Sequence, residues 1–256
     1  MSDNYVIPML EKAFEVLELI SNTHEELSLS EISQKLDIPK TTVFRIMTTL
    51  QKWGYVEKSL EQETFRLGKI LIKMGKQAAS DLDIKEISLP YLDELAKETG
   101  ESANLGILYQ EEVLTLANAK GEDFYLISRL IPTSPLNCSS MGKLYLAEYS
   151  MEELEEYFRS SKPQKRTIRS ITNLEDFLKL REEIKKEGLS YDREEYEYGL
   201  TCMAAPIRDK KGNLVASMSI SGPTSRLLHK GEDQLKEKLL KASSSLSKVY
   251  NEVFRD

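Results

Sequence analysis

Residues 28–54 read SLSEISQKLDIPKTTVFRIMTTLQKWG, and this stretch decides the fold of the N-terminal part. Ser28, with Glu31 three residues later, forms a capping box, which is typical of a helix start. The apolar spacing that follows predicts a helix of about two turns. Asp37-Ile38-Pro39 then makes a tight break, and a second helix is expected from about Lys40 to Trp53. The pattern is helix, tight turn, helix.

The second helix of this stretch has two chemically distinct faces. At about 100° per residue, Val43, Ile46, Met47 and Leu50 share one side and are expected to pack inward. The opposite side carries hydroxyls and cations: Thr41, Arg45, Thr48 and Lys52, flanked by Thr42 and Thr49. Threonine hydroxyls bond phosphates or base edges, and arginine pairs with guanine. Because no acid interrupts this face, DNA reading is favoured over an ordinary solvated surface helix.

Outside this stretch the sequence completes a winged helix-turn-helix. Apolar residues at helical spacing predict a helix over residues 9–21. Two short strands, at residues 55–58 and 64–67, read as a hairpin. Lys58 and Arg66 lie on it and are expected to contact flanking phosphates. The nearby acids Glu61 and Glu63 weaken this contact and favour a mainly structural hairpin.

Charge and length divide the chain into two parts. The whole chain has 256 residues, a net charge of −7 and a pI near 5.2, which argues against a nucleic-acid partner. Residues 38–80, however, hold eight Lys and Arg against three Glu. We therefore expect a DNA-binding domain over residues 1–66, a linker helix over 67–82 and a second domain over 83–256.

The second part reads as an α+β domain. Strands are expected at 102–109, 112–119, 124–130, 200–207 and 214–221. Helices are expected at about 83–100, 141–148 and 173–186, with another that starts near residue 150 and a long closing helix. Mixed strands and helices of this kind predict a central sheet with helices packed on it.

Three segments of the second part carry a family resemblance. The segment GLSYDREEYEYGLTCMAAP at 188–206, the strand and turn VASMSISGP at 215–223 and the loop SSMGK at 139–143 resemble, in this order, the IclR family of bacterial transcription regulators. The N-terminal domain has that family's position and length. The resemblance covers nearly the whole chain and implies a GAF-like effector-binding domain, assembled as a dimer or dimer of dimers.

The resemblance also implies an effector site. The matching positions are Ser140, Met141, Asp192, Leu200, Cys202, Ser219 and Ser221. Many relatives have Gly and Ala where this chain has Ser140 and Met141, and the bulkier pair implies a different effector shape.

Four of these residues have plainer interpretations from the sequence alone. Ser217, Ser219 and Ser221 share one face of a strand; that face either borders a pocket or is exposed to solvent. Asp192 either faces the site or belongs to an acidic solvated turn. Cys202 is either a site residue or a small buried hydrophobe.

An enzyme is disfavoured by the sequence. Only His24 and His229 could act as a base beside a cysteine, and neither lies in a fitting segment. No P-loop, dinucleotide fingerprint or HExxH motif is present, so we expect no cofactor and no metal. The chain lacks a secretory signal and a disulfide framework, so we expect a cytoplasmic protein.

The sequence thus predicts a ligand-responsive regulator, most simply a repressor. Two copies are expected to bind double-stranded DNA at a palindromic operator. A small carboxylate or sugar acid is expected in the C-terminal domain. The alternative is a sensor whose winged helix contacts protein instead of DNA, and the acidic pI favours it.

Overall fold

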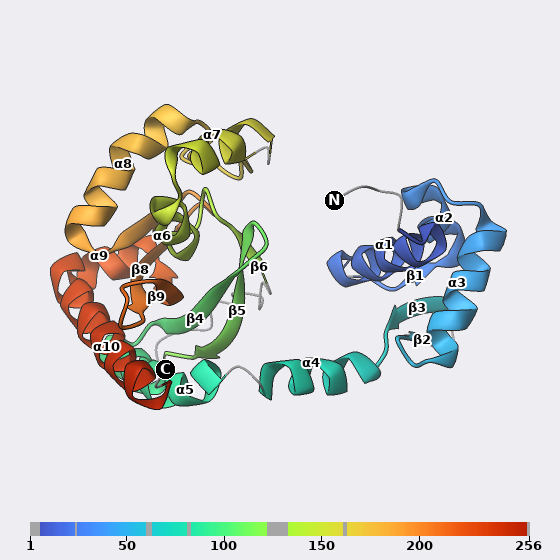
Figure 1. Ribbon diagram of the computed structural model, residues 1–256, viewed down its shortest axis with the longest axis horizontal. Coiled ribbons are helices and arrows are strands. Elements are labelled where there is room, and N and C mark those ends of the chain that lie inside the picture. The colour runs from blue at the N-terminus through green and yellow to red at the C-terminus, as the bar shows by residue number, and fades with distance from the viewer. Residues whose placement is uncertain are drawn as a thin grey trace. The chain divides into compact units, whose positions relative to one another are not determined.

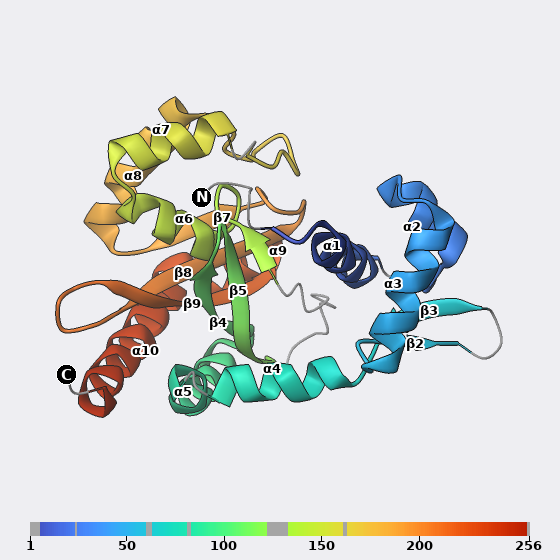
Figure 2. The same cartoon turned by 45° about the vertical axis from the view of Figure 1, so that its right-hand side comes forward.

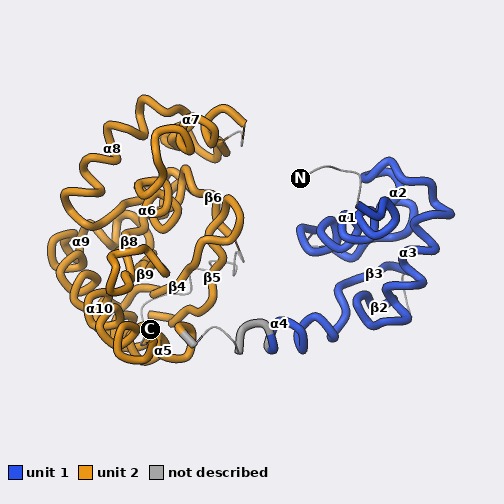
Figure 3. The backbone as a smooth tube through the Cα atoms, viewed as in Figure 1, with its two compact units in different colours: residues 1–82 blue, residues 83–256 orange. Residues whose placement is uncertain are grey.

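The computed structural model describes residues 6–23, 25–59, 63–80, 83–121, 133–160 and 163–254. The chain divides into two compact units, Met1–Leu82 and Asp83–Asp256, which Figure 3 shows in different colours. Within the described residues, no helix is both long enough and apolar enough to span a membrane.

Three helices build most of the first unit: α1 (Pro8–Asn22), α2 (Leu29–Leu36) and α3 (Lys40–Lys52). The predicted capping box is confirmed, since the Glu31 carboxylate accepts a hydrogen bond from the Ser28 backbone N–H at 2.7 Å and the Ser28 hydroxyl accepts from the Glu31 N–H at 3.4 Å. Asp37, in the turn after α2, has a left-handed φ of 52°. The predicted helix–turn–helix is therefore present.

A small antiparallel sheet completes this unit, with the order β1 (Leu27–Ser28), β3 (Thr64–Leu67) and β2 (Val56–Lys58). The hairpin of β2 and β3 is confirmed. The strand β1, which precedes the cap of α2, was not predicted. Its buried Leu27 pairs with Phe65 and joins the core formed by the three helices. The helix α4 (Ile70–Ser80) follows β3.

The second unit contains a six-stranded antiparallel sheet in the order β6-β5-β4-β9-β8-β7. Its strands are β4 (Ser102–Tyr109), β5 (Glu112–Ala119), β6 (Thr133–Pro135), β7 (Ser190–Arg193), β8 (Leu200–Arg208) and β9 (Leu214–Pro223). The register between β4 and β5 shifts at Leu105 and Gly106. A Cβ at Gly106 would lie 2.5 Å from a Val113 methyl, so only glycine fits at this irregularity.

Helices cover both faces of this sheet (Figures 1 and 2). On one face lie α5 (Asp83–Thr99), α9 (Thr224–Lys230) and α10 (Glu232–Val253). On the other face lies α6 (Ser140–Glu148), with α7 (Met151–Ser160) and α8 (Leu174–Glu187) outside it. The predicted α+β architecture is therefore present.

The strand predictions were incomplete in this unit. The segment 124–130, predicted as a strand, lies outside the described residues. The short strands β6 and β7 were not predicted, because three or four residues give too little alternation to detect. They form the two edges of the sheet and, as described below, both contribute to the pocket.

Candidate functional site

The helix α3 presents the polar face that its sequence predicts. Val43, Ile46 and Met47 are buried in the core of the first unit. Of the six predicted DNA-contacting residues on α3, Thr42 is half-buried. The other five are exposed: Lys40, Thr41, Arg45, Thr48 and Lys52. The helix contains no acidic residue. This face can therefore approach a polyanion without carboxylate repulsion.

Side-chain hydrogen bonds limit which groups on α3 can donate outward. The Thr48 hydroxyl donates to the Phe44 carbonyl at 2.8 Å, and the Thr49 hydroxyl donates to the Arg45 carbonyl at 2.9 Å. A hydroxyl has a single hydrogen, so these two threonines retain only acceptor capacity. The Arg45 guanidinium has no ion-pair partner within the described part of the chain. Arg45 and Lys52 are therefore the main cationic donors on this face.

The two predicted cations of the hairpin are paired with acids. Lys58 Nζ lies 3.1 Å from a Glu63 oxygen, and Arg66 Nη2 lies 3.2 Å from a Glu57 oxygen. Glu26, next to β1, adds a second acid 3.9 Å from Arg66. Both cations are exposed, so such pairs are weak and can be exchanged for phosphate. The contribution of the hairpin to anion binding is nevertheless reduced.

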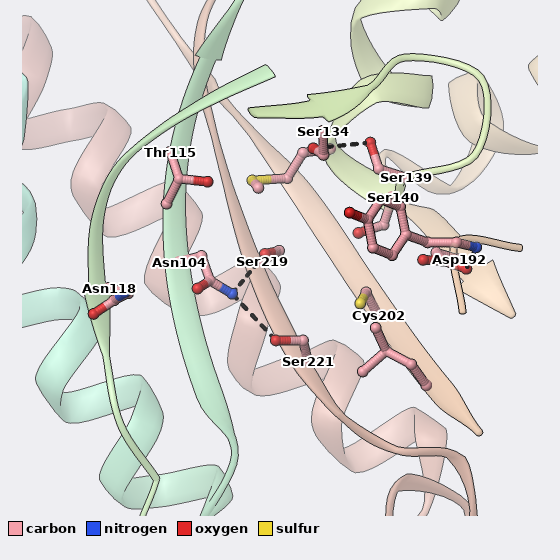
Figure 4. A pocket seen from close by; sticks show the side chains of 13 residues that line it. Asn104, Thr115, Asn118, Ser134, Ser139, Ser140, Asp192, Cys202, Ser219 and Ser221 are labelled. Carbon is pink, nitrogen blue, oxygen red and sulfur yellow. Dashed lines mark hydrogen bonds between the residues drawn. The ribbon is translucent and has the colours of Figure 1, made fainter. Parts of the chain in front are cut away.

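In the second unit, all seven residues implied by the resemblance lie around one pocket between the sheet and the start of α6 (Figure 4). They come from β7, β8, β9 and α6, which are far apart in the sequence. The pocket has a volume of about 120 Å³. This exceeds several-fold the space that one water molecule requires and suits a small organic molecule.

Six further residues line this pocket and were not predicted: Asn104, Thr115, Asn118, Ser134, Ser139 and Tyr196. Asn104 lies on β4 and Ser134 on β6, so the sheet pairing brings them to the site. A polar Asn104 inside the otherwise apolar β4 is the one signal in the sequence that pointed to it.

The serine face of β9 is buried, so the solvent-exposed interpretation is wrong. Ser217 and Ser219 are 0% and 2% exposed. Ser217 donates to the Gly106 carbonyl at 3.2 Å and does not line the pocket. The Asn104 amide donates to Ser219 at 3.3 Å and to Ser221 at 3.2 Å, as the dashed lines in Figure 4 show. Each of these two hydroxyls therefore keeps its own hydrogen to donate to a ligand.

Asp192 is also buried, at 1% exposure, so the solvated-turn interpretation is wrong. Its Oδ1 accepts hydrogen bonds from the backbone N–H groups of Glu195 at 2.7 Å and Tyr196 at 3.2 Å. Burial raises the pKa of the Asp192 carboxyl to about 7, against the opposing charge of Lys143. The carboxyl can therefore accept or donate a hydrogen bond near neutral pH.

A buried ion pair supports the turn that holds Asp192. Lys143, on α6, is fully buried and pairs with Glu195. Glu195 Oε2 has no hydrogen-bond partner within the described part of the chain. The pair fixes α6 against the β7–β8 turn beside the pocket.

The first turn of α6 borders the pocket with Ser140 and Met141. Ser139 caps the helix by accepting from the Gly142 N–H at 3.0 Å, and its hydroxyl donates to the Pro135 carbonyl at 2.7 Å. A Cβ at Gly142 would lie 2.4 Å from the Leu136 Cα, so the helix start packs directly on the loop before it. First-turn N–H groups lack helical partners and attract anions.

The side chains that line the pocket are suited to binding a ligand rather than to nucleophilic attack. Among the described residues that line it, none is lysine or arginine, and Asp192 is the one carboxylate. Burial and the nearby Asp192 raise the pKa of the Cys202 thiol, which disfavours a reactive thiolate. The pocket instead offers hydroxyl, amide and backbone donors.

Comparisons with known proteins agree with this architecture. A family model described as "IclR helix-turn-helix domain" matches residues 9–59, and one described as "Bacterial transcriptional regulator IclR C-terminal" matches residues 76–248.

Individual relatives match over almost their whole length. The chain is 31% identical to the HTH-type transcriptional regulator BhcR of Paracoccus denitrificans, over 96% of this chain and 88% of the relative. It is 31% identical to the DNA-binding transcriptional repressor YiaJ of Escherichia coli, over 94% and 87%. A crystal structure of an IclR homolog from Microbacterium hydrocarbonoxydans, complexed with 4-hydroxybenzoate, has a TM-score of 0.79 and 24% identity, covering 94% of this chain and 98% of that one.

Proposed function

Because the chain belongs to the IclR family of bacterial DNA-binding transcriptional regulators, we propose that it is a repressor whose hold on a palindromic operator is controlled by a small carboxylate. The observation that carries the proposal is the pocket: residues from β7, β8, β9 and α6 converge there with hydrogen-bonding groups.

The proposed division of labour follows the two units. Residues 1–66 form the DNA-binding domain, α4 within 67–82 is the linker helix, and 83–256 form a GAF-like effector-binding domain. The exposed Met74 and the half-buried Ile70, one turn apart on α4, support a linker that packs against a second copy.

The proposed DNA contacts lie mainly on α3: Lys40, Thr41, Thr42, Arg45, Thr48 and Lys52. Arg45 is the principal base-reading residue, because its guanidinium is exposed and matches the paired acceptors of guanine. Lys58 and Arg66 are secondary phosphate contacts, formed by exchanging their carboxylate partners for phosphate.

A palindromic operator requires two copies of the domain. The helix α1 supports self-association, since Leu10 and Phe14, one turn apart, are 51% and 56% exposed. Such an apolar stripe on a surface helix is stabilised when a second copy covers it. We propose a dimer, which a second interface would extend to a tetramer.

The proposed effector is a small organic acid or sugar acid. The free hydroxyl hydrogens of Ser219 and Ser221 and the first-turn N–H groups of α6 suit its carboxylate. Asp192 suits a hydroxyl on the same molecule, and Leu200, Cys202, Ser140 and Met141 complete the walls. That a protein of the same fold is complexed with 4-hydroxybenzoate is compatible with a carboxylate ligand.

The effector site is tested by thermal-shift screening of small carboxylates and sugar acids against the full chain. A hit is expected to stabilise the wild-type protein and to lose most of its effect in Ser219→Ala. Ser217→Ala is the matched control, because Ser217 is buried on the same strand but does not line the pocket. Equal ligand shifts in both variants would place the site elsewhere.

A further inference from the structure

An aromatic side chain stands among the polar groups of α3. Phe44 is 58% exposed and directly precedes Arg45. A single exposed apolar residue is common on protein surfaces and needs no partner. Phe44 differs because it lies on a helix without acids, beside the cation proposed to read a base.

The groups around Phe44 define what this part of the helix can recognise. Thr48, one turn further along, donates its hydroxyl hydrogen to the carbonyl of Phe44 itself. That hydroxyl cannot donate to a base edge. On this side of the helix, a base therefore meets the aromatic ring of the residue that precedes Arg45 in the sequence.

One base feature in the major groove matches an apolar side chain. The 5-methyl group of thymine is the apolar mark that distinguishes it from the other bases in B-DNA, and Phe is among the side chains that contact it. Positive charge on Lys40, Arg45 and Lys52 complements the phosphates that border the groove.

We propose that Phe44 is a specificity-determining residue that packs on a thymine methyl in each operator half-site, adjacent to the base pair bound by Arg45. This inference rests on the proposed function, since it requires α3 to enter the major groove. The proposed contact would specify thymine at one position of the half-site, which the polar side chains of α3 alone do not do.

The test replaces one methyl group at a time. Operator duplexes are first selected from a randomised DNA library with the full-length protein. Each thymine of a half-site is then replaced by deoxyuridine, which removes the methyl and keeps base pairing. Burial of one methylene-sized group is worth about 0.8 kcal/mol, so the wild-type protein is expected to bind about fourfold more weakly at one thymine position.

Variants assign that loss to Phe44. Phe44→Ala is expected to bind the thymine and deoxyuridine duplexes equally, while Phe44→Leu retains part of the difference. Trp53→Ala is the matched control, because Trp53 is 67% exposed just beyond the end of α3 and its loss is expected to keep the fourfold ratio. Circular dichroism of each variant verifies folding.

Two results would overturn the inference. One is a wild-type protein that selects an operator but is insensitive to deoxyuridine at every thymine. The other is a Phe44→Ala protein that keeps the wild-type ratio. Failure of the wild-type protein to select any DNA sequence would instead contradict the proposed function itself, and the role of Phe44 with it.

Discussion

At the residue scale, Arg45 is exposed, and no described acid forms an ion pair with it. A bidentate contact to a base is worth about 1–3 kcal/mol. Arg45→Ala is therefore expected to weaken operator binding by about 5- to 150-fold while leaving the fold intact, as measured by gel-shift titration.

The matched control removes an exposed arginine from the other unit. Arg159, whose side chain is 77% exposed, is expected to tolerate Arg159→Ala without loss of operator affinity. Equal affinities for Arg45→Ala and wild type would contradict the role assigned to Arg45.

Asp192 makes stability depend on pH. Its folded pKa of about 7 lies above the value of about 3.9 for an unfolded aspartate. The folded state thus binds more protons between these values, so the stability contributed by Asp192 falls as pH rises from about 4 to about 7. Between about pH 5 and about pH 8, the wild-type melting temperature is expected to fall more than that of Asp192→Asn. Parallel melting curves would contradict the raised pKa.

At the residue scale, the sequence predicted many of the residues that line the pocket, but it missed those that only strand pairing brings there. The seven residues chosen by resemblance all line one pocket, but Asn104 was missed because its role depends on strand pairing with β9. The pairing of Arg66 with Glu26 was missed for the same reason, since the acid lies beside the unpredicted β1.

At the scale of elements, capping decides where helices begin. Loss of an N-cap serine costs about 0.5–2 kcal/mol. Ser28→Ala is expected to lower the free energy of unfolding of the first unit by this amount, monitored by fluorescence of the single tryptophan, Trp53.

The chain offers a matched control in its second capping box. Ser150 accepts from the Glu153 N–H at 3.2 Å at the start of α7. Because Ser150 lies in the other unit, Ser150→Ala is expected to leave the Trp53 transition unchanged. A shift of equal size in both variants would mean that the signal reports global unfolding.

The buried ion pair between Lys143 and Glu195 joins α6 to the β7–β8 turn beside the pocket. Breaking such a pair by removing one partner costs about 3–5 kcal/mol, because the other charge stays buried. Lys143→Met is expected to destabilise the second unit by this amount in calorimetry, and the double variant with Glu195→Gln is expected to recover part of the loss. A double variant no more stable than Lys143→Met would contradict the coupling.

Long, periodic or capped elements were predictable, and short edge strands were not. Residues 9–21 and 173–186 were predicted as helices within one or two residues, because apolar spacing or caps mark them. The strands β1, β6 and β7 span two to four residues, and neighbouring strands rather than local pattern define them.

At the scale of the whole molecule, the net charge of −7 is the sum over two units and hides how the charges are distributed within each. The helix α3 carries three cations, Lys40, Arg45 and Lys52, and no acid. The pI of the whole chain is therefore a poor guide to nucleic-acid binding, because the local charge of the helix that would contact DNA can differ from that of the rest of the chain.

The proposed self-association is assigned to the exposed stripe of α1, formed by Leu10 and Phe14. Replacing both Leu10 and Phe14 by Glu is expected to give a monomer in sedimentation velocity and to weaken operator binding. Gln34→Glu, an exposed substitution on α2, is expected to remain a dimer. A double variant that sediments as wild type would exclude α1 from the interface.

The most direct measurement is operator affinity with and without effector, by fluorescence anisotropy of full-length protein on the selected duplex. Saturating effector is expected to change the operator Kd of the wild-type protein by about 5- to 150-fold, the usual range of coupling. In Ser219→Ala the apo Kd is expected to stay the same while the effector response is lost. An unchanged operator Kd in wild-type protein that is saturated with ligand would contradict the account.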